Sequence, residues 1–297
     1  MSDSNPRVRL AAAFLLLVLP LFAVHAQPGA GPSYGKINPE QMARMMNPVE
    51  DGPFHMINLI QFRDQARYPD GRKTDLTGEQ ANRLYSPVGI LQEIGAAVVF
   101  VARVDDVPMG DGTEWDQVAI VRYPSRRAFL QMTQRPDFRA QSIHKDAGVG
   151  KTIVMVAHLI EPATLDASTP PQPSGSTAAD QAPTELVHVL RYREDASYGD
   201  GAGAPAISGR EAMQKYIGGT EPVADDGTFR FEIEGVFVGD DRTWDEVRIR
   251  RFEDEAALDE YLRHAGREQA ERHWNAALAD GYAIQAKPMI NRLFEKD

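Results

Sequence analysis

The chain has 297 residues, of which 42% are hydrophobic, and this length and composition are sufficient for about two globular domains. Its formal net charge of −11 argues against nucleic-acid binding, because contact with phosphates needs surplus lysine and arginine. The absence of cysteine excludes disulfides, thiol catalysis and thiolate metal sites.

Residues 1–26 are typical of a secretory signal peptide. Two arginines precede the apolar run LAAAFLLLVLPLFAV, and the motif VHA places small residues where a signal peptidase cuts. We therefore expect cleavage before Gln27, export to the periplasm or the exterior, and no stable membrane insertion afterwards. A retained anchor helix is the alternative, although the run is short for a ~20-residue span and contains Pro20.

Residues 27–53 form an N-terminal extension. Its segment NPEQMARMMNP predicts a short helix with Asn38 as N-cap and a proline in the first turn. This helix could pack its methionines against the domain that follows.

Blocks of sequence then recur in the same order, 129–131 residues apart. FRDQARYPDG returns as YREDASYGDG, TGEQANRLY as SGREAMQKY, and WDQVAIVRY as WDEVRIRRF. A period this long is unlike a solenoid repeat and indicates a duplicated domain. We place the two domains at 54–161 and 185–297, joined by a linker at 162–184 that is rich in Pro, Ser, Thr and Ala.

The elements of the first copy are predicted in the order β-α-β-β-α-β. Strands are expected at 54–62, 97–104, 115–123 and 151–160. A capping box at Thr77 begins the first helix, and Ser125 caps the second, which restarts at Pro136.

The second copy repeats this order. Strands are expected at 186–192, 229–238, 244–252 and 282–289, with a capping box at Ser208 and a helix over 256–279. The fold class is therefore α+β, with two ferredoxin-like domains. Each sheet would have helices on one face and leave the other bare. We expect the two bare faces to cover each other in a pseudo-dimeric alpha-beta barrel.

The segment WDQVAIVRYPSRRAFLQMTQRPDF, followed by a histidine, resembles the family called domain of unknown function 1330, of the dimeric alpha-beta barrel superfamily. The resemblance covers most of 54–160 and, more faintly, 185–290, where the words YPSR and RPDF are missing. It implies the fold. The superfamily includes small monooxygenases, lactone isomerases and haem proteins, but the family has no settled activity.

His144 and His273 are the candidate catalytic residues, because they occupy equivalent positions in the two copies. His144 lies on an apolar helical stripe with Ala140, Ile143 and Ala147. Histidine can serve as an acid or base near neutral pH, and it can bind haem or a metal. A histidine at the core edge that is bonded to a backbone carbonyl is the structural alternative.

Arg122 and Arg251 end equivalent strands and could clamp a carboxylate of a ligand through two parallel hydrogen bonds. A simple ion pair at the strand end is the alternative. Further candidate ligand-binding residues are Tyr85, Tyr216, Asn58 and Arg63. The tyrosines could instead pack their rings, and we expect Trp115 and Trp244 to plug one end of the sheets.

The second copy also carries Arg248 and Arg250 where the first has Ala119 and Val121. They could line a charged lumen, or form a ladder on a wet sheet face with Glu232 and Glu234. The first copy would then hold the drier cleft. Histidines at short metal spacing and the common nucleotide and hydrolase motifs are absent, so no metal is expected.

Three functions follow from these patterns. The first is an exported small-molecule enzyme, such as a cofactor-independent isomerase or monooxygenase that acts on a small organic acid, with His144 as acid or base. The second is a non-catalytic periplasmic binding or scaffold module. The third is haem binding through a histidine. No other cofactor is expected, and the ~24-residue linker allows the halves to pair within one chain or between chains by self-association.

Overall fold

The computed structural model describes residues 35–161, 183–199, 207–220, 228–265 and 268–293. The predicted signal peptide and nearly all of the predicted linker lie outside these residues. Within them, no helix combines the length and the apolar character needed to cross a membrane.

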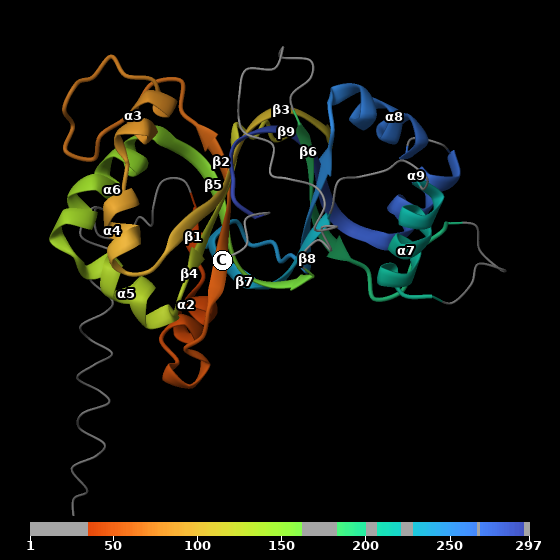
Figure 1. The fold of residues 1–297 in the computed structure, drawn as a ribbon, viewed down its shortest axis with the longest axis horizontal. Helices are drawn as coiled ribbons and strands as arrows, with labels where there is room; N and C mark the ends of the chain where they lie inside the picture. Colours follow the sequence, from red (N-terminus) through yellow and green to blue (C-terminus); the bar gives the residue numbers. More distant parts are fainter. Residues whose placement is uncertain (1–34, 162–182, 200–206, 221–227, 266–267, 294–297) are drawn as a thin grey trace, which may run out of the picture.

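Eight antiparallel strands form a closed barrel at the centre of the molecule (Figure 1). The first half of the chain contributes β2 (Phe54–Phe62), β3 (Ala97–Met109), β4 (Gln117–Tyr123) and β5 (Val149–Glu161). The second half contributes β6 (Thr184–Tyr192), β7 (Thr228–Gly239), β8 (Glu246–Phe252) and β9 (Leu278–Asn291). Around the barrel the order is β7-β5-β2-β4-β3-β9-β6-β8, and pairing of β8 with β7 closes the ring.

The barrel that the sequence led us to expect is present, and the two halves join edge to edge to close it. β3 pairs with β9, and β5 pairs with β7, so both junctions lie within a single chain. Equivalent strands follow the same order around the ring, which is β5-β2-β4-β3 in the first half and then β9-β6-β8-β7 in the second. A closed ring satisfies the backbone groups at the edges that two separate sheets would expose.

The barrel interior is an apolar core to which both halves contribute. Alternation along each strand directs every second side chain inward. Ile57, Ile120, Ile249 and Ile284 are among these side chains, and all four are fully buried. The bare sheet faces of the two halves therefore bury each other in one apolar core, as the duplication led us to expect.

Helices cover the outside of the barrel in two groups on opposite sides (Figure 1). The first group is α3 (Gly78–Leu84), α4 (Val88–Glu93), α5 (Arg126–Gln134) and α6 (Pro136–Gly148). The second is α7 (Gly209–Thr220), α8 (Glu255–Ala265) and α9 (Glu268–Ala277), so the long helix predicted at 256–279 is two helices, and β9 begins at Leu278. The capping box predicted at Thr77 is present, with both of its hydrogen bonds.

The repeated Trp-Asp pair has a structural role in both halves. The carboxylate of Asp116 accepts a hydrogen bond from the backbone N–H of Phe62 at 2.6 Å, and Asp245 does the same with Tyr192 at 2.7 Å. Each aspartate therefore ties the start of one strand to the end of its neighbour. The tryptophan beside it is buried, as we expected of a plug.

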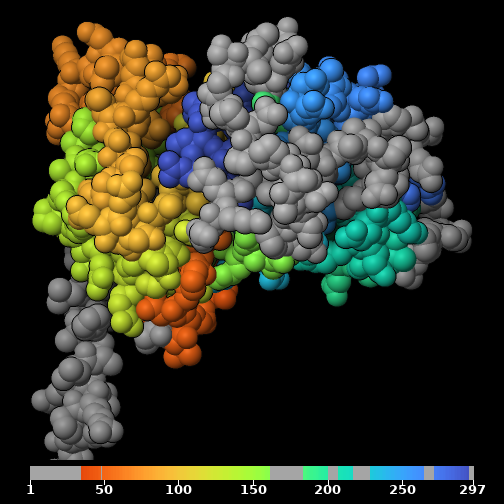
Figure 2. Space-filling model, viewed as in Figure 1, coloured from red at the N-terminus to blue at the C-terminus, as the bar shows by residue number. Residues whose placement is uncertain are grey.

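The N-terminal extension connects the two halves. It contains β1 (Lys36–Ile37), α2 (Pro39–Met45) and the short 3-10 helix η1 (Pro48–Glu50), and Asn38 caps α2 as predicted. β1 pairs with β7 of the second half, while the carboxylate of Glu50 binds Arg126 of α5 in the first half. Figure 2 shows this segment (orange-red) against the yellow-green helices of the first half.

Candidate functional site

Four charged or titratable residues occupy one end of the barrel, where β2 and β6 begin and β4 and β8 end. They are His55, Arg122, Glu185 and Arg251, and together we call them the mouth cluster. His55 lies opposite Arg122 across β2 and β4, and Glu185 lies opposite Arg251 across β6 and β8. Alternation places all four on the inward face, above the apolar core.

The mouth cluster follows the duplication of the chain. Arg122 and Arg251 hold equivalent positions, as the sequence indicated, and His55 and Glu185 are equivalent to each other. The predicted ion pair of Arg251 exists, because its Nε lies 3.4 Å from Oε1 of Glu185. Asn291 also donates to that oxygen at 2.8 Å.

His55 sits in a positively charged part of the mouth. Burial, followed by the charges of Arg122 and His158, lowers the pKa of His55 to about 4. Its ring lies edge-on to Phe231, with 5.2 Å between ring centroids. The buried Nδ1 makes no hydrogen bond within the described part of the chain. The imidazole is therefore neutral at pH 7 and has one unused polar atom.

Small side chains share the mouth layer. Ala97 lies opposite Arg122, Ala157 lies opposite His55, and Ala286 lies opposite Glu185. These alanines add little side-chain volume to the layer that holds the mouth cluster.

The opposite end of the barrel is plugged. Trp115 and Trp244 both pack against Tyr282, with centroid distances of 5.9 and 5.5 Å. Outside this aromatic layer, Arg242 binds the carboxylates of Asp111, Asp240 and Asp280 at 2.7–3.3 Å. The mouth cluster is therefore at the end of the barrel opposite this aromatic plug.

The structure places His144 and His273 on the outer helices, in contact with tyrosines. Nδ1 of His144 lies 2.8 Å from the hydroxyl of Tyr68, and Nδ1 of His273 lies 2.9 Å from that of Tyr198. Both tyrosines belong to the repeated block that follows the first strand of each half. None of these contacts links His144 to Arg122 or Tyr85. A catalytic role for either histidine stays a prediction.

We expect each Tyr–His pair to act as a clamp between a loop and a helix. Tyr68→Phe should reduce the free energy of unfolding by about 0.5–1.5 kcal/mol, because a partly buried hydrogen bond is lost. Tyr198→Phe should have the same effect. A double-mutant cycle of Tyr68→Phe with His144→Ala, measured by urea denaturation, should give a coupling energy of similar size. Unchanged stability in every variant would instead favour a chemical role for the histidines.

The other predicted ligand-binding residues face the helix layers, away from the mouth. The side-chain amide of Asn58 donates to the backbone oxygens of Met56 and Ala119. Tyr85 packs against Phe138, and burial, with the nearby charge of Asp146, raises its pKa.

Tyr216 is only 3% exposed and packs against Trp274, at 5.2 Å between centroids. Burial raises its pKa, and a hydrogen bond with Tyr261 adds to the shift. Arg63 is half-buried at the end of β2, where burial, helped by the charge of Arg67, lowers its pKa. These residues support packing roles more directly than ligand contact.

Arg248 and Arg250 are neither in a lumen nor on a wet face. They point toward the helix layer of the second half, where Arg248 is 6% exposed and Arg250 donates to the hydroxyl of Tyr261 at 3.1 Å. Sequence alternation correctly placed Arg248 and Arg250 on the face of the sheet opposite Val247 and Ile249. It did not predict that helices cover this face.

Metal and haem are two kinds of site that would involve histidines. Among the described residues, no group of three or more His, Asp or Glu could hold a metal ion. In the layer next to His273, Tyr216, Tyr261 and Trp274 are 0–5% exposed and fill the space between sheet and helices. Haem binding through a histidine stays a prediction.

A hollow of about 540 Å³ lies on the outer surface, where the N-terminal extension meets both halves. Arg44, Arg126, Glu234 and His158 line it, and their charges largely pair with each other. We regard it as a structural junction.

Comparison with known proteins gives similarity to solved structures alone. No family model and no curated protein matches the chain. A protein of unknown function from Rhodopseudomonas palustris is 28% identical, over 43% of this chain and 98% of its own, with a TM-score of 0.38. Chlorite dismutase from Candidatus Nitrospira defluvii, in complex with imidazole, is 13% identical, over 84% and 95%, with a TM-score of 0.41. An anthrone oxidase-like protein is 9% identical, over 81% and 92%, with a TM-score of 0.44.

Proposed function

We propose that this protein is an exported ligand-binding protein whose mouth cluster binds a small organic anion, most simply a carboxylate. The observation that carries the proposal is the placement of His55, Arg122 and Arg251 on the inward faces of β2, β4 and β8 at one end of the barrel, with Glu185 as the carboxylate among the four. The guanidinium groups of Arg122 and Arg251 would attract an anion in a setting where electrostatic interactions are stronger than in water.

Each mouth residue has a distinct role in this proposal. Arg122 and Arg251 approach from opposite halves and bind the carboxylate oxygens, because a guanidinium matches a carboxylate in shape and charge. Nδ1 of His55 supplies a further donor once it is protonated. Glu185 and Asn291 hold Arg251 in position.

The test uses benzoate as the probe, because its ring can pack beside Phe231. We expect benzoate to raise the melting temperature. In isothermal titration calorimetry, Arg122→Gln and Arg251→Gln should weaken binding at least tenfold, since a charge-assisted hydrogen bond contributes about 1.5–3 kcal/mol. Arg67→Gln, which alters an exposed arginine outside the mouth, should bind like the parent protein. Equal affinity in all four proteins, or no binding, would contradict the proposal.

Binding should also depend on pH. The pKa of His55 is about 4 in the free protein, and a bound anion beside the ring would raise it. The complex therefore takes up a proton, and the affinity should increase as the pH falls from 7 toward 4.5, where benzoate is still largely ionised. His55→Asn should remove most of this slope.

An enzymatic version of the proposal retains the same site. If the bound acid is isomerised or oxygenated, His55 is the titratable group in the mouth that can exchange a proton with it. We would therefore test His55 as acid or base before His144. We also infer that the two halves are ferredoxin-like repeats, a view that their shared strand order supports.

A further inference from the structure

A second cluster of charges lies on the outward face of β7 and β8, in the second half of the chain. Glu246 is buried at its centre. Arg230 donates to this carboxylate through Nε at 2.8 Å and Nη2 at 3.2 Å, and Arg248 donates through Nε. Arg210 of α7 donates at 3.4 Å. Three guanidinium groups thus meet at one carboxylate. We call these four residues, with Tyr192, the arginine cluster.

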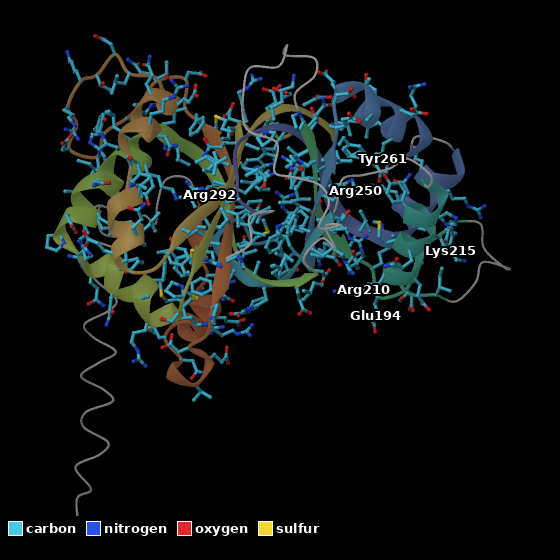
Figure 3. All side chains as sticks on the ribbon, in the orientation of Figure 1. Glu194, Arg210, Lys215, Arg250, Tyr261 and Arg292 are labelled. Carbon is cyan, nitrogen blue, oxygen red and sulfur yellow. The ribbon has the colours of Figure 1, made fainter. Side chains whose placement is uncertain are left out.

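The cluster is graded from buried to exposed. The side chain of Glu246 is 1% exposed and that of Arg248 is 7%, whereas Arg230 is 23% and Arg210 is 52% exposed. Figure 3 shows Arg210 at the rim of the second half, while Arg250 and Tyr261 lie next to each other deeper in the same half. The carboxylate is therefore at the base of the cluster, and two of the cations can be reached from solvent.

Tyr192 forms one wall of the cluster. Its ring lies beneath the guanidinium of Arg210, 4.5 Å from the centroid, and its hydroxyl donates to Glu246 at 3.1 Å. Arg248 donates to the same hydroxyl at 3.3 Å. These contacts fix two arginines in position while using one N–H of Arg210 and two of Arg248, out of the five that each guanidinium carries.

The first half of the chain is an internal control for this arrangement. Alignment of the repeated blocks places Glu79 at the position of Arg210, Ala119 at that of Arg248 and Gln117 at that of Glu246. The barrel therefore closes in the first half without such a cluster. The cations are also unusual in their surroundings, since residues 165–297 contain 15 Lys and Arg against 26 Asp and Glu, a net charge of −11.

We propose that the arginine cluster binds the phosphate group of a small phosphoester. Three guanidinium groups gather at one place on this face, and a phosphate group carries a charge of about −1.5 to −2 at neutral pH. Arginine forks pair with phosphate oxygens in a bidentate manner. Glu246 is a positioning residue that orients the forks from below, and the ring of Tyr192 holds the guanidinium of Arg210 in place.

The test is calorimetric titration of the full chain with phenyl phosphate at pH 7.5 and low salt. Binding should weaken at least tenfold in Arg230→Gln. It should also weaken at least tenfold in Arg210→Glu, which restores the residue of the first half. Arg83→Gln, an exposed arginine on α3, should stay within twofold of the parent protein, and added salt should weaken binding.

Two further variants make the result decisive. Arg210→Gln replaces Arg210→Glu if circular dichroism shows that the glutamate variant fails to fold. Arg122→Gln, which removes the mouth arginine, should leave phosphate binding within twofold, so failure of the mouth proposal and failure of this one can be told apart. Absence of binding, or equal affinity in the parent, Arg210 and Arg230 proteins, would overturn the proposal.

Discussion

Replacing Arg126 with alanine is expected to lower the free energy of unfolding by about 3–5 kcal/mol, because it breaks a buried ion pair and leaves buried Glu234 with the more exposed Arg44 and His158 as its ionisable partners. Arg126 donates to Glu234 at 2.6 Å, and both side chains are 4% exposed. It also donates to the backbone oxygen of Arg44 at 2.7 Å and to Glu50 at 2.8 Å. One side chain thus links α5, β7 and the N-terminal extension.

Urea denaturation at pH 7 checks this expectation, with Arg127→Ala as the control. Arg127 is adjacent and also pairs with an acid, but its side chain is 68% exposed, so its loss should cost about 1 kcal/mol or less. The double variant Arg126→Met with Glu234→Leu should recover much of the lost stability, because no charge stays buried alone. A loss below about 1 kcal/mol in Arg126→Ala would show that the junction is not a buried ion pair in solution.

The same junction should make stability depend on pH. Burial acts to raise the pKa of Glu234, but hydrogen bonds from His158 and Gln41 and the charges of Arg126 and Arg44 lower it to about 2. A depressed carboxyl pKa stabilises the fold above the unfolded value of 4.5, and this stabilisation is lost as the pH falls from 4.5 to 2. The difference in stability between the parent protein and Glu234→Gln should therefore shrink over that interval.

The sequence predicted local structure and a barrel, but it did not predict which strands join the two halves. Strand alternation, the capping box at Thr77 and the N-cap at Asn38 are local signals, and the structure has all three. Pairing of β3 with β9 joins residues almost 200 positions apart, and no local pattern encodes such a contact. The bare sheet faces therefore indicated a barrel, whereas the pairing of particular edge strands was open at the level of sequence.

The candidate site was half predictable for a related reason. Arg122 and Arg251 were found because both copies retain arginine at that position. His55 and Glu185 are equivalent in space but differ in residue type, so comparison of the copies did not single them out. Their signal was alternation, since His55 precedes Ile57 and Leu59, and Glu185 precedes Val187 and Val189, on the inward face of each strand. His144 and His273 drew attention by recurring, yet the repeated tyrosines explain that recurrence.

Glycine to alanine at position 78 is expected to destabilise the protein by about 3 kcal/mol or more. Gly78 begins α3, and its N–H donates to the backbone oxygen of Arg63 at 2.9 Å. A Cβ at this position would lie 2.4 Å from that oxygen and 2.4 Å from the oxygen of Gly148. Both obstacles are backbone atoms, so neither can move aside as a flexible side chain could. The helix would have to shift away from the end of β2, and overpacking of this kind typically costs about 1–3 kcal/mol, or more where the backbone itself must move.

The duplication supplies a replicate and α4 supplies a control for this prediction. A Cβ at position 209 would lie 2.4 Å from the backbone oxygen of Ala277 and 2.5 Å from that of Arg193. Gly209→Ala should therefore lower the free energy of unfolding by a similar amount. Gly89 lies within α4, and an added Cβ would have no neighbour within 4 Å, so Gly89→Ala should stabilise by about 0.5–1 kcal/mol through helix propensity. Thermal and urea unfolding of the three variants measure these effects. Similar stabilities for Gly78→Ala and Gly89→Ala would mean that α3 is not held against the end of β2. The loop that carries Tyr68 would then be held by the contact of Tyr68 with His144 but not by the packing of α3.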